Sequence, residues 1–516
     1  MDYLVNEVSE VNVVNKVNEV NVANEISQDK RNGAKTFKKY GLISLIYGII
    51  YSFCLYDNHS GITYPFYMLA TIICLGLVRK KDGLSLIKDS SGKSALGIFY
   101  VLSLMLLAIH RCLTTSFAII FWEGLATNLL LFSFIVYLYV DTREFEIAAW
   151  FKSLFLTLVK PIIHIARPIK DFIDYKNEMA KGDNQERRKT IIAVICGIAI
   201  AIPLVVVIVA LLSSADLVFS RMLTDILEKI NLPDNFWDII WASVTAIVAI
   251  WFAYIIPDSL NTEGVNAGAS NSKKGNPVIA ITFTSIIGVV YIVFSMIQVL
   301  YLFTGSIELP KGYTYADYAH EGFYQLLAVC IINLIMVSLC KSLFRESKIL
   351  KFILATIGVL TYILIASSAT RMFLYIGVYH LTFLRLFVLW VLAVLCIWLA
   401  FLIISLYLDK FPVFKAGMVA VTIAFIAFVY SNPDYQIAKY DLEVAAEQID
   451  DYTSVESYII YHLSTDAVPA LTSDATLLDR YEDHAVYKFV DEDYTGIRKY
   501  NFSYGRAKKV FAQAKN

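Results

Sequence analysis

The sequence predicts an all-α protein: a polytopic transmembrane helical bundle of about eleven spans with a small helical extracytoplasmic C-terminal domain. Three observations support this fold class. First, 58% of the 516 residues are apolar, against about 45–50% in soluble proteins. Second, the excess lies in long runs, and a helix needs about 20 apolar residues to cross a bilayer. Third, Lys and Arg gather in every second loop between these runs.

Residues 1–39 precede the first apolar run. Val-Asn pairs recur every three residues between Val11 and Asn21. This period fits neither the 3.6 residues of a helix nor the two residues of a strand. We therefore predict a disordered, low-complexity cytoplasmic leader. Its polar start does not resemble a cleavable signal peptide, so the first span is expected to act as the insertion signal.

Eleven apolar runs are candidate spans, of which the first three are shorter or less sharply bounded than the others. A segment rich in Asn, Gly and Ser at 257–277 is predicted to be a flexible cytoplasmic linker. It separates a first transmembrane helical group at 40–256 from a second group at 278–430. The candidate spans are residues 40–56, 61–78, 95–110, 117–140, 190–213, 236–256, 278–303, 323–343, 350–368, 383–408 and 412–430.

The distribution of Lys and Arg orients these spans, because cytoplasmic loops are enriched in both residues. With the N-terminus inside, the inner loops carry clusters such as Arg79-Lys80-Lys81 and about ten basic residues between 143 and 189. We therefore predict a cytoplasmic N-terminus and an extracytoplasmic C-terminus in a bacterial plasma membrane. The outer loops hold only Arg111, Arg221, Lys229, Lys311 and Arg371.

Two segments are predicted to lie along the membrane surface instead of crossing it. Residues 145–172 mix large apolar side chains with Lys and Arg and contain Pro161 and Pro168. This composition is typical of a basic helix on the acidic inner leaflet. Residues 215–232 place apolar side chains at helical spacing between charged ones. That pattern predicts an amphipathic helix on the outer surface.

The C-terminal domain, residues 431–516, is predicted to consist of short helices and is divided by charge. Residues 434–493 contain fifteen Asp or Glu and three Lys or Arg, whereas residues 494–516 contain six Lys or Arg and no acid. One interpretation is a solvated cap. The other is that the basic end folds onto the acidic part or onto lipid headgroups.

Polar side chains gather in the outer halves of the predicted spans, while the inner halves are almost purely apolar, with Asn333 as the main exception. An ionisable group inside a bilayer costs about 3 kcal/mol or more, so it usually faces protein or water. One hypothesis is an outward-open polar cavity, in which Glu321 also pairs with Arg385. The alternative is ordinary enrichment at the interface plus structural ion pairs. The candidate ligand-binding residues are Glu123, Gln298, Glu321, Gln325, Arg371 and Arg385.

No catalytic motif accompanies these residues. His320-Glu321 is followed by Gly322 and does not form HExxH, and neither a Walker A nor a GxSxG pattern occurs. The seven cysteines lie in or beside apolar runs without CxxC spacing, as expected of apolar fillers. We therefore predict no enzymatic activity, no catalytic residue, no metal site and no cofactor. An intramembrane transferase is the weakest alternative.

Four motifs, with a weaker fifth, carry a family resemblance. They are ADYAHEGFYQLL at 316–327, YHLTFLRLF at 379–387, NPDYQIAKY at 432–440 and LSTDAVPAL at 463–471, with SSADLVF at 213–219 as the weaker fifth. Together they resemble a bacterial family of multi-pass membrane proteins known only as domain of unknown function four-one-seven-three. The resemblance covers about residues 90–510 and implies the same fold and membrane location, but no substrate. The family pattern has Tyr-Gly-Leu-Thr where this chain has His380 in second place, so His380 is not a family residue.

Two functions follow as hypotheses. The first is a permease-like protein that binds a polar or amphipathic ligand through the outward-facing polar cavity. The alternative is a non-transporting structural or signalling membrane protein whose C-terminal domain binds an envelope component. Coupled transport usually needs polar groups at mid-membrane, so the apolar inner halves count against a simple carrier. The expected partners are membrane lipids and an envelope component or small polar solute, and no nucleic acid.

Overall fold

The computed structural model describes residues 32–88, 94–140, 147–179, parts of 190–215, 216–229, 235–263, 275–303, 315–408, 411–443, 452–490 and 496–515. In these residues the chain is helical apart from turns and connections. The first helix covers residues 32–55. The others in the membrane-sized part are α2 (Thr63–Lys81), α3 (Ala95–Arg111), α4 (Phe117–Tyr139), α5 (Ile147–Ile163), α6 (Arg167–Met179), α8 (Leu217–Lys229), α9 (Phe236–Glu263), α10 (Pro277–Phe303), α11 (Tyr315–Leu343), α12 (Lys348–Tyr379), α13 (Phe383–Tyr407) and α14 (Val413–Tyr430).

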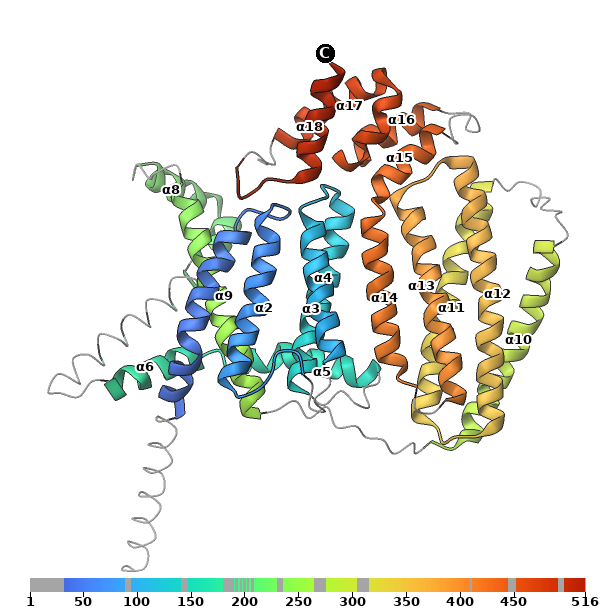
Figure 1. Cartoon of the computed structure of the whole chain (residues 1–516), viewed down its shortest axis with the longest axis horizontal. Coiled ribbons are helices and arrows are strands. Elements are labelled where there is room, and N and C mark those ends of the chain that lie inside the picture. Colours follow the sequence, from blue (N-terminus) through green and yellow to red (C-terminus); the bar gives the residue numbers. More distant parts are fainter. Residues whose placement is uncertain are drawn as a thin grey trace, which may run out of the picture.

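The long helices form two groups with α14 between them (Figure 1). The first helical group contains the helix over 32–55 with α2, α3, α4 and α9, and the second contains α10, α11, α12 and α13. α14 packs against α3 on one side and α13 on the other. It therefore joins the two groups, although the sequence placed it within the second.

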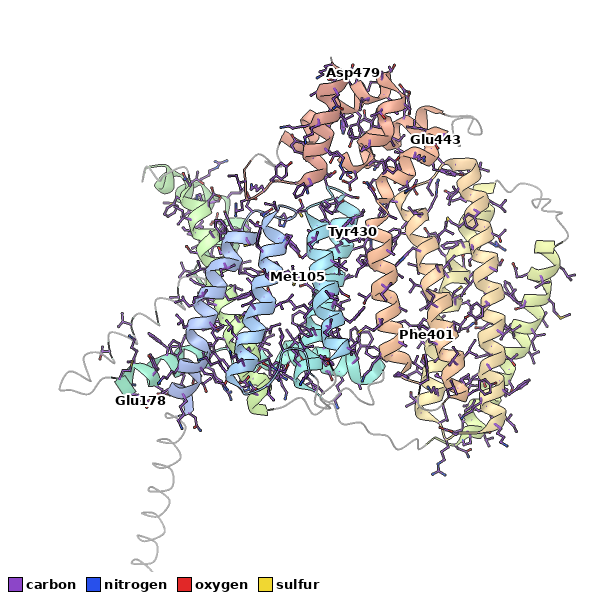
Figure 2. All side chains as sticks on the ribbon, viewed as in Figure 1. Met105, Glu178, Phe401, Tyr430, Glu443 and Asp479 are labelled. Carbon is purple, nitrogen blue, oxygen red and sulfur yellow. The ribbon has the colours of Figure 1, made fainter. Side chains whose placement is uncertain are left out.

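Aromatic side chains fill the junction between the two groups. Phe387 of α13 stacks on Trp122 of α4, with ring centroids 4.7 Å apart, and its ring lies 5.9 Å from that of Phe428 of α14. Below the rings, Tyr100, Leu104 and Phe134 belong to the same buried cluster as Phe428. Figure 2 shows side chains projecting between the helices throughout this region. These aromatic residues belong to the apolar runs that the sequence predicted as spans. Their ring contacts explain how α14 packs against both groups.

Seven described helices are long and apolar enough to cross a membrane, as expected of a polytopic helical protein. They are α4, α9, α10, α11 from Gly322 onward, α12, α13 and α14. The predicted spans 40–56, 61–78 and 95–110 coincide with helices, but these fall below the same length or hydropathy. The predicted span 190–213 is described only in part. The count of eleven spans therefore stays a prediction.

Two predicted boundaries are wrong in the described residues. Residues 32–39, assigned to the disordered leader, are helical. The Phe37 ring stabilises this turn, because it lies 5.1 Å from Phe172 of α6 and 6.1 Å from Tyr254 of α9. At the linker, α9 continues through Pro257 to Glu263. The rest of the predicted leader, and linker residues 264–274, lie outside the described residues.

The segment predicted to lie on the inner leaflet forms two helices. α5 and α6 are bent by 51° relative to one another, and Figure 1 shows them across the lower ends of the first helical group. Arg167, which opens α6, pairs with Asp258 of α9 at 2.9 Å. If α5 and α6 together formed one bent span, the number of candidate spans among the described residues would rise to eight. The second predicted surface segment contains α8, and its position on the outer surface stays a prediction.

The C-terminal residues fold into a small helical body, which we call the cap (residues 433–515). It lies over one end of the bundle (Figure 1). Its elements are α15 (Pro433–Glu443), α16 (Tyr452–His462), the 3₁₀-helix η2 (Thr465–Ser473), α17 (Ala475–Val490) and α18 (Phe502–Ala514). α18 packs Ala507 and Phe511 into the cap core, and Lys515 pairs with Glu482 of α17 at 2.8 Å. The basic end therefore folds onto the acidic part, with apolar contacts as well as charge.

The cap shares an apolar core with the second helical group. Ile437 and Val455 of the cap belong to the same buried cluster as Phe323 of α11 and Leu364 of α12. Leu381, between α12 and α13, is part of this cluster, and its backbone N–H donates to the Asp441 carboxylate at 2.8 Å. The cap and the α12–α13 turn therefore form one packed unit.

His380 occupies a backbone conformation that suits glycine. It ends α12 with φ +73° and ψ 169°, a region that is essentially confined to glycine and costs a side-chain-bearing residue about 1–3 kcal/mol. The imidazole Nδ1 lies 3.7 Å from a carboxylate oxygen of Asp441, too far for a hydrogen bond. This backbone conformation explains why the family pattern that the chain resembles has glycine at this position.

We predict that His380→Gly raises the melting temperature of the purified protein, because it relieves the backbone strain. His380→Ala should lower the melting temperature, because it keeps the strain and removes the contacts with Asp441 and Tyr458. Thermal unfolding in detergent measures both. A glycine variant no more stable than the alanine variant would contradict the strain at this position.

Candidate functional site

A cavity lies at the cap-side ends of α11, α12 and α13, which we call the rim cavity. Its volume is about 170 Å³, well above the ~10–15 Å³ that a single water needs by such a measure. Tyr324 and Leu384 remain 44% and 57% exposed, so the cavity borders the surface of the bundle. It is lined by Phe323, Tyr324, Met372, Tyr375, Thr382, Leu384, Arg385 and Val388.

Two groups at the rim cavity carry positive charge or partial positive charge: a guanidinium and a helix N-terminus. The Arg385 guanidinium lies 4.2 Å from the centre of the Tyr375 ring, and its Nη1 donates to the carbonyls of Tyr379 (3.0 Å) and His380. The N-terminus of α13 also faces this region, with Thr382 as its N-cap. Helix N-termini and guanidinium groups both favour anions. The remaining lining is mostly apolar, so the cavity suits an anionic group attached to an apolar body.

Arg371 lies against α11 near the rim cavity without lining it. An added Cβ on Gly322 would be 2.0 Å from Nη1 of Arg371. Only glycine therefore lets the guanidinium pack on this turn of α11. Gln325 is exposed on the same helix. The side chain of Glu321 lies outside the described residues, so its expected pairing with Arg385 stays a prediction.

Glu123 forms a separate buried site in the first helical group. Its carboxylate is fully buried and contacts His110 Nδ1 of α3 at 2.6 Å. Tyr430 of α14 lies with its ring 4.8 Å from the imidazole. Arg111, also buried, donates to the carbonyls of His59 (2.8 Å) and Ile120 (2.6 Å). His110 therefore supplies the hydrogen bond of a carboxylate that would be costly to bury alone, while the other oxygen of Glu123 has no hydrogen-bond partner among the described residues.

The structure thus divides the six predicted ligand-binding residues among several places. Arg385 lines the rim cavity, and Arg371 packs beside it. Glu123 pairs with His110 instead, and Gln298 of α10 accepts a hydrogen bond from Ser367 of α12 at 2.6 Å. In the described part, the charge balance between Glu123 and the two arginines is not seen. Side chains far apart in the sequence cannot be assigned partners from their depth alone.

The sequence reasoning missed the residues that fasten the cap to the first helical group, which we call the cap clamp. Thr114 donates to the Asp466 carboxylate, and the hydroxyls of Thr115 and Thr465 are 2.6 Å apart. The Asn501 amide donates to the carbonyls of Ser60 and Thr114, at 2.9 Å each. All these residues are buried. A run of three hydroxyl residues at 114–116, between two apolar helices, was the available signal.

Asp466 is the titratable group at the centre of the cap clamp. Burial raises the pKa of its carboxyl to about 6, and the nearby Asp434 carboxylate acts in the same direction. Hydrogen bonds from Thr114, Thr115 and Ser503 oppose the rise in pKa. The ionised form is therefore the costly one in the folded protein, in spite of its donors.

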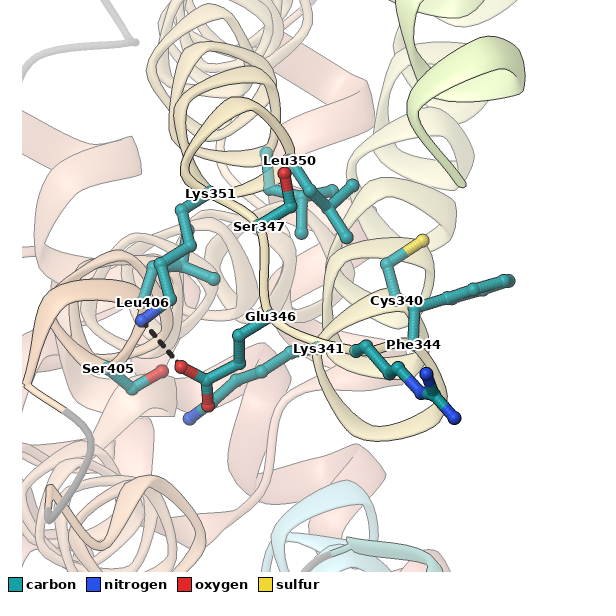
Figure 3. A pocket seen from close by; sticks show the side chains of 11 residues that line it. Cys340, Lys341, Phe344, Glu346, Ser347, Leu350, Lys351, Ser405 and Leu406 are labelled. Carbon is teal, nitrogen blue, oxygen red and sulfur yellow. Dashed lines mark ion pairs between the residues drawn. The ribbon is translucent and has the colours of Figure 1, made fainter. Parts of the chain in front are cut away.

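A small pocket lies at the opposite ends of α11, α12 and α13 (Figure 3). Its volume is about 30 Å³, enough for about two waters and too small for an organic ligand. Lys341, Arg345 and Lys351 line it, and Lys351 pairs with Glu346 at 3.0 Å. These residues belong to one of the basic loops that the sequence predicted to lie inside. No group of three metal-ligating side chains occurs in the described residues.

The seven long apolar helices of the described chain indicate an integral membrane protein. The chain belongs to the family of the domain of unknown function DUF4153, whose family model matches residues 83–473. The match confirms that the chain belongs to a family without an assigned function. It does not confirm the family number, four-one-seven-three, that the resemblance suggested. No curated protein and no solved structure matches the chain.

The folded protein, held together in part by the cap clamp, should become more stable as the pH falls. Because the pKa of Asp466 is about 6 in the folded protein and 3.8 in its ordinary state, the stability linked to protonation is fully present below pH 4 and lost as the pH rises through 6. The change is about 3 kcal/mol at most. The melting temperature should therefore be higher at pH 5 than at pH 7.5, and Asp466→Asn should reduce that difference.

The control for this pH test is Asp479→Asn on the exposed side of α17, which should leave the pH dependence unchanged. An Asp466→Asn protein with the full wild-type pH dependence would show that Asp466 does not titrate in this range.

Proposed function

We propose that this protein is a non-enzymatic, permease-like protein of the bacterial plasma membrane, which binds an anionic amphipathic ligand in the rim cavity. The observation that carries the proposal is the arrangement around Arg385: a guanidinium and a helix N-terminus at a cavity with otherwise aromatic and aliphatic walls. A phosphate or carboxylate would occupy the polar end, and an alkyl chain would follow the surface at Tyr324 and Leu384.

We further propose eleven spans, with the N-terminus in the cytoplasm and the cap outside. Two observations support this arrangement: the basic loops of the sequence, and the position of the cap at the opposite end of the bundle from the basic turn at 341–351 (Figure 1). In this orientation the rim cavity is at the level of the outer leaflet headgroups, where an amphipathic anion is available.

The binding test compares phosphatidylglycerol with phosphatidylcholine in native mass spectrometry and in vesicle reconstitution. The wild-type protein should retain phosphatidylglycerol preferentially. Arg385→Gln should weaken that binding by about tenfold or more, since a hydrogen bond to a charged group contributes about 1.5–3 kcal/mol. Val388→Phe, which fills the cavity, should have the same effect without removing a charge. Inorganic phosphate should not displace the lipid, because it lacks the apolar body.

Arg345→Gln is the matched control, because it removes an exposed arginine at the opposite end of the bundle. Equal lipid retention by the Arg345 and Arg385 variants would overturn the rim cavity as the binding site.

The orientation predicts which single cysteines react from outside. In a cysteine-free chain, a cysteine at exposed Ser473 of the cap should be labelled by a membrane-impermeant thiol reagent in intact cells, whereas one at exposed Asn276 should react only after lysis. The reverse pattern would place the cap in the cytoplasm.

The alternative function, a structural or signalling protein whose cap binds an envelope component, is favoured by one observation. The cap packs onto the second helical group and is hydrogen-bonded to the first through the cap clamp. A mechanical force on the cap would therefore be transmitted to both groups. Retention of an envelope fraction by full-length protein, lost on mutation of the outer cap surface and unchanged in Arg385→Gln, would favour this function over ligand binding in the rim cavity.

A further inference from the structure

Six buried polar side chains lie on three helices of the second helical group, and we call this set the polar seam. They belong to three helices that pack together, since α12 contacts both α10 and α11. All six are at least nine-tenths buried, and none carries a charge. The polar seam consists of Ser295 and Gln298 of α10, Asn333 of α11, and Thr361, Ser367 and Ser368 of α12.

Two hydrogen bonds fix the positions of four of these side chains. Ser367 Oγ donates to Gln298 Oε1 at 2.6 Å, and Asn333 Nδ2 donates to Thr361 Oγ1 at 2.9 Å. On α12 the two bonds are six residues apart, which is about 9 Å along the helix. The polar seam therefore runs along the helices through part of the membrane.

Three oxygens of the polar seam have no hydrogen-bond partner among the described residues. They are Ser295 Oγ, Asn333 Oδ1 and Ser368 Oγ, on side chains that are 2%, 0% and 0% exposed. Buried polar atoms are nearly always paired, with protein or with ordered water. Three such atoms on three adjoining helices point to a polar occupant that hydrogen-bonds to them.

The two ends of the polar seam differ. At the outer end, Met372 follows Ser368 by one helical turn on α12 and lines the rim cavity. At the inner end, the helices close with apolar side chains: Val337 of α11 and Leu354 and Ile357 of α12 belong to one buried cluster with Ala280 of α10. The polar seam therefore adjoins the rim cavity and stops at an apolar layer.

We propose that the polar seam is a hydrated half-channel, which admits water and small uncharged hydrogen-bonding solutes from the cap side as far as Asn333 and Thr361. Hydroxyls and amides without a charged group suit neutral solutes, because they offer both donors and acceptors. The apolar layer below prevents passage in this conformation. This site is independent of the anionic ligand in the rim cavity, since none of its six residues lines that cavity.

Cysteine accessibility tests the half-channel in the full-length chain with all seven native cysteines replaced. Ser295→Cys, Ser368→Cys and Thr361→Cys should react with methyl methanethiosulfonate, which is small and uncharged like the proposed solutes. Only the thiolate reacts, and it forms where water is present, so these rates should exceed that of a lipid-facing cysteine by about tenfold or more.

Two control positions define the background. Val293→Cys of α10 is 54% exposed on the bundle surface, and Leu354→Cys is buried in the apolar layer; neither should react. Monodispersity and melting temperature confirm that each variant is folded, and the three seam positions on two helices guard against the loss of one. The same rates in vesicles of phosphatidylcholine alone, which contain no anionic lipid, separate this result from lipid binding. Seam cysteines that react no faster than Val293→Cys would overturn the half-channel.

Discussion

The hydrogen bonds between Asp466 and the α3–α4 turn are the interaction on which the rest of the structure depends. On its other side the cap is continuous with the core of the second helical group through Ile437 and Leu381. In the described residues the cap clamp, α14 and the stacking of Phe387 on Trp122 connect that unit to the first group. Because the clamp atoms are buried, removing one partner leaves the other without water or protein, which costs about 1–3 kcal/mol for a neutral group. Polar contacts thus act together with the aromatic junction to place the two groups.

The distribution of polar groups along the bundle has a physical logic. Toward the cap, charges and amides occur in compensated arrangements: Glu123 with His110, Arg385 with carbonyls and a ring, Gln298 with Ser367. Toward the other end, α10, α11 and α12 pack mainly through apolar side chains, with Thr284 as a buried polar exception that donates to the carbonyl of Ala280. A ligand from the cap side would meet a graded polar environment and then a largely apolar layer.

The helices were largely predictable because apolar runs of membrane length have few alternatives. Of the candidate residues whose side chains are described, Arg385 alone lines the rim cavity, and the partners of the others were not predictable. The position of a residue along a span predicts its depth in the membrane, but not the direction in which its side chain points around the helix axis. Glu123 could therefore be matched with Arg371 as readily as with His110. The polar seam was missed because serine and threonine are common in apolar helices and only packing shows which of them share a buried face. The strain at His380 was visible as a departure from a glycine pattern, and the backbone angle explains it.

The clamp joins residues that are far apart in the chain: Asn58 and Thr63 contact the carbonyl of Arg498, and the N–H of Phe502 donates to the carbonyl of Cys112. During biosynthesis the first helices are inserted long before these partners leave the ribosome. The turns that receive the cap must therefore remain without their protein partners until residues 466–502 have been synthesised. A nascent chain or C-terminal truncation would display these turns, giving membrane quality control a marker of unfinished molecules.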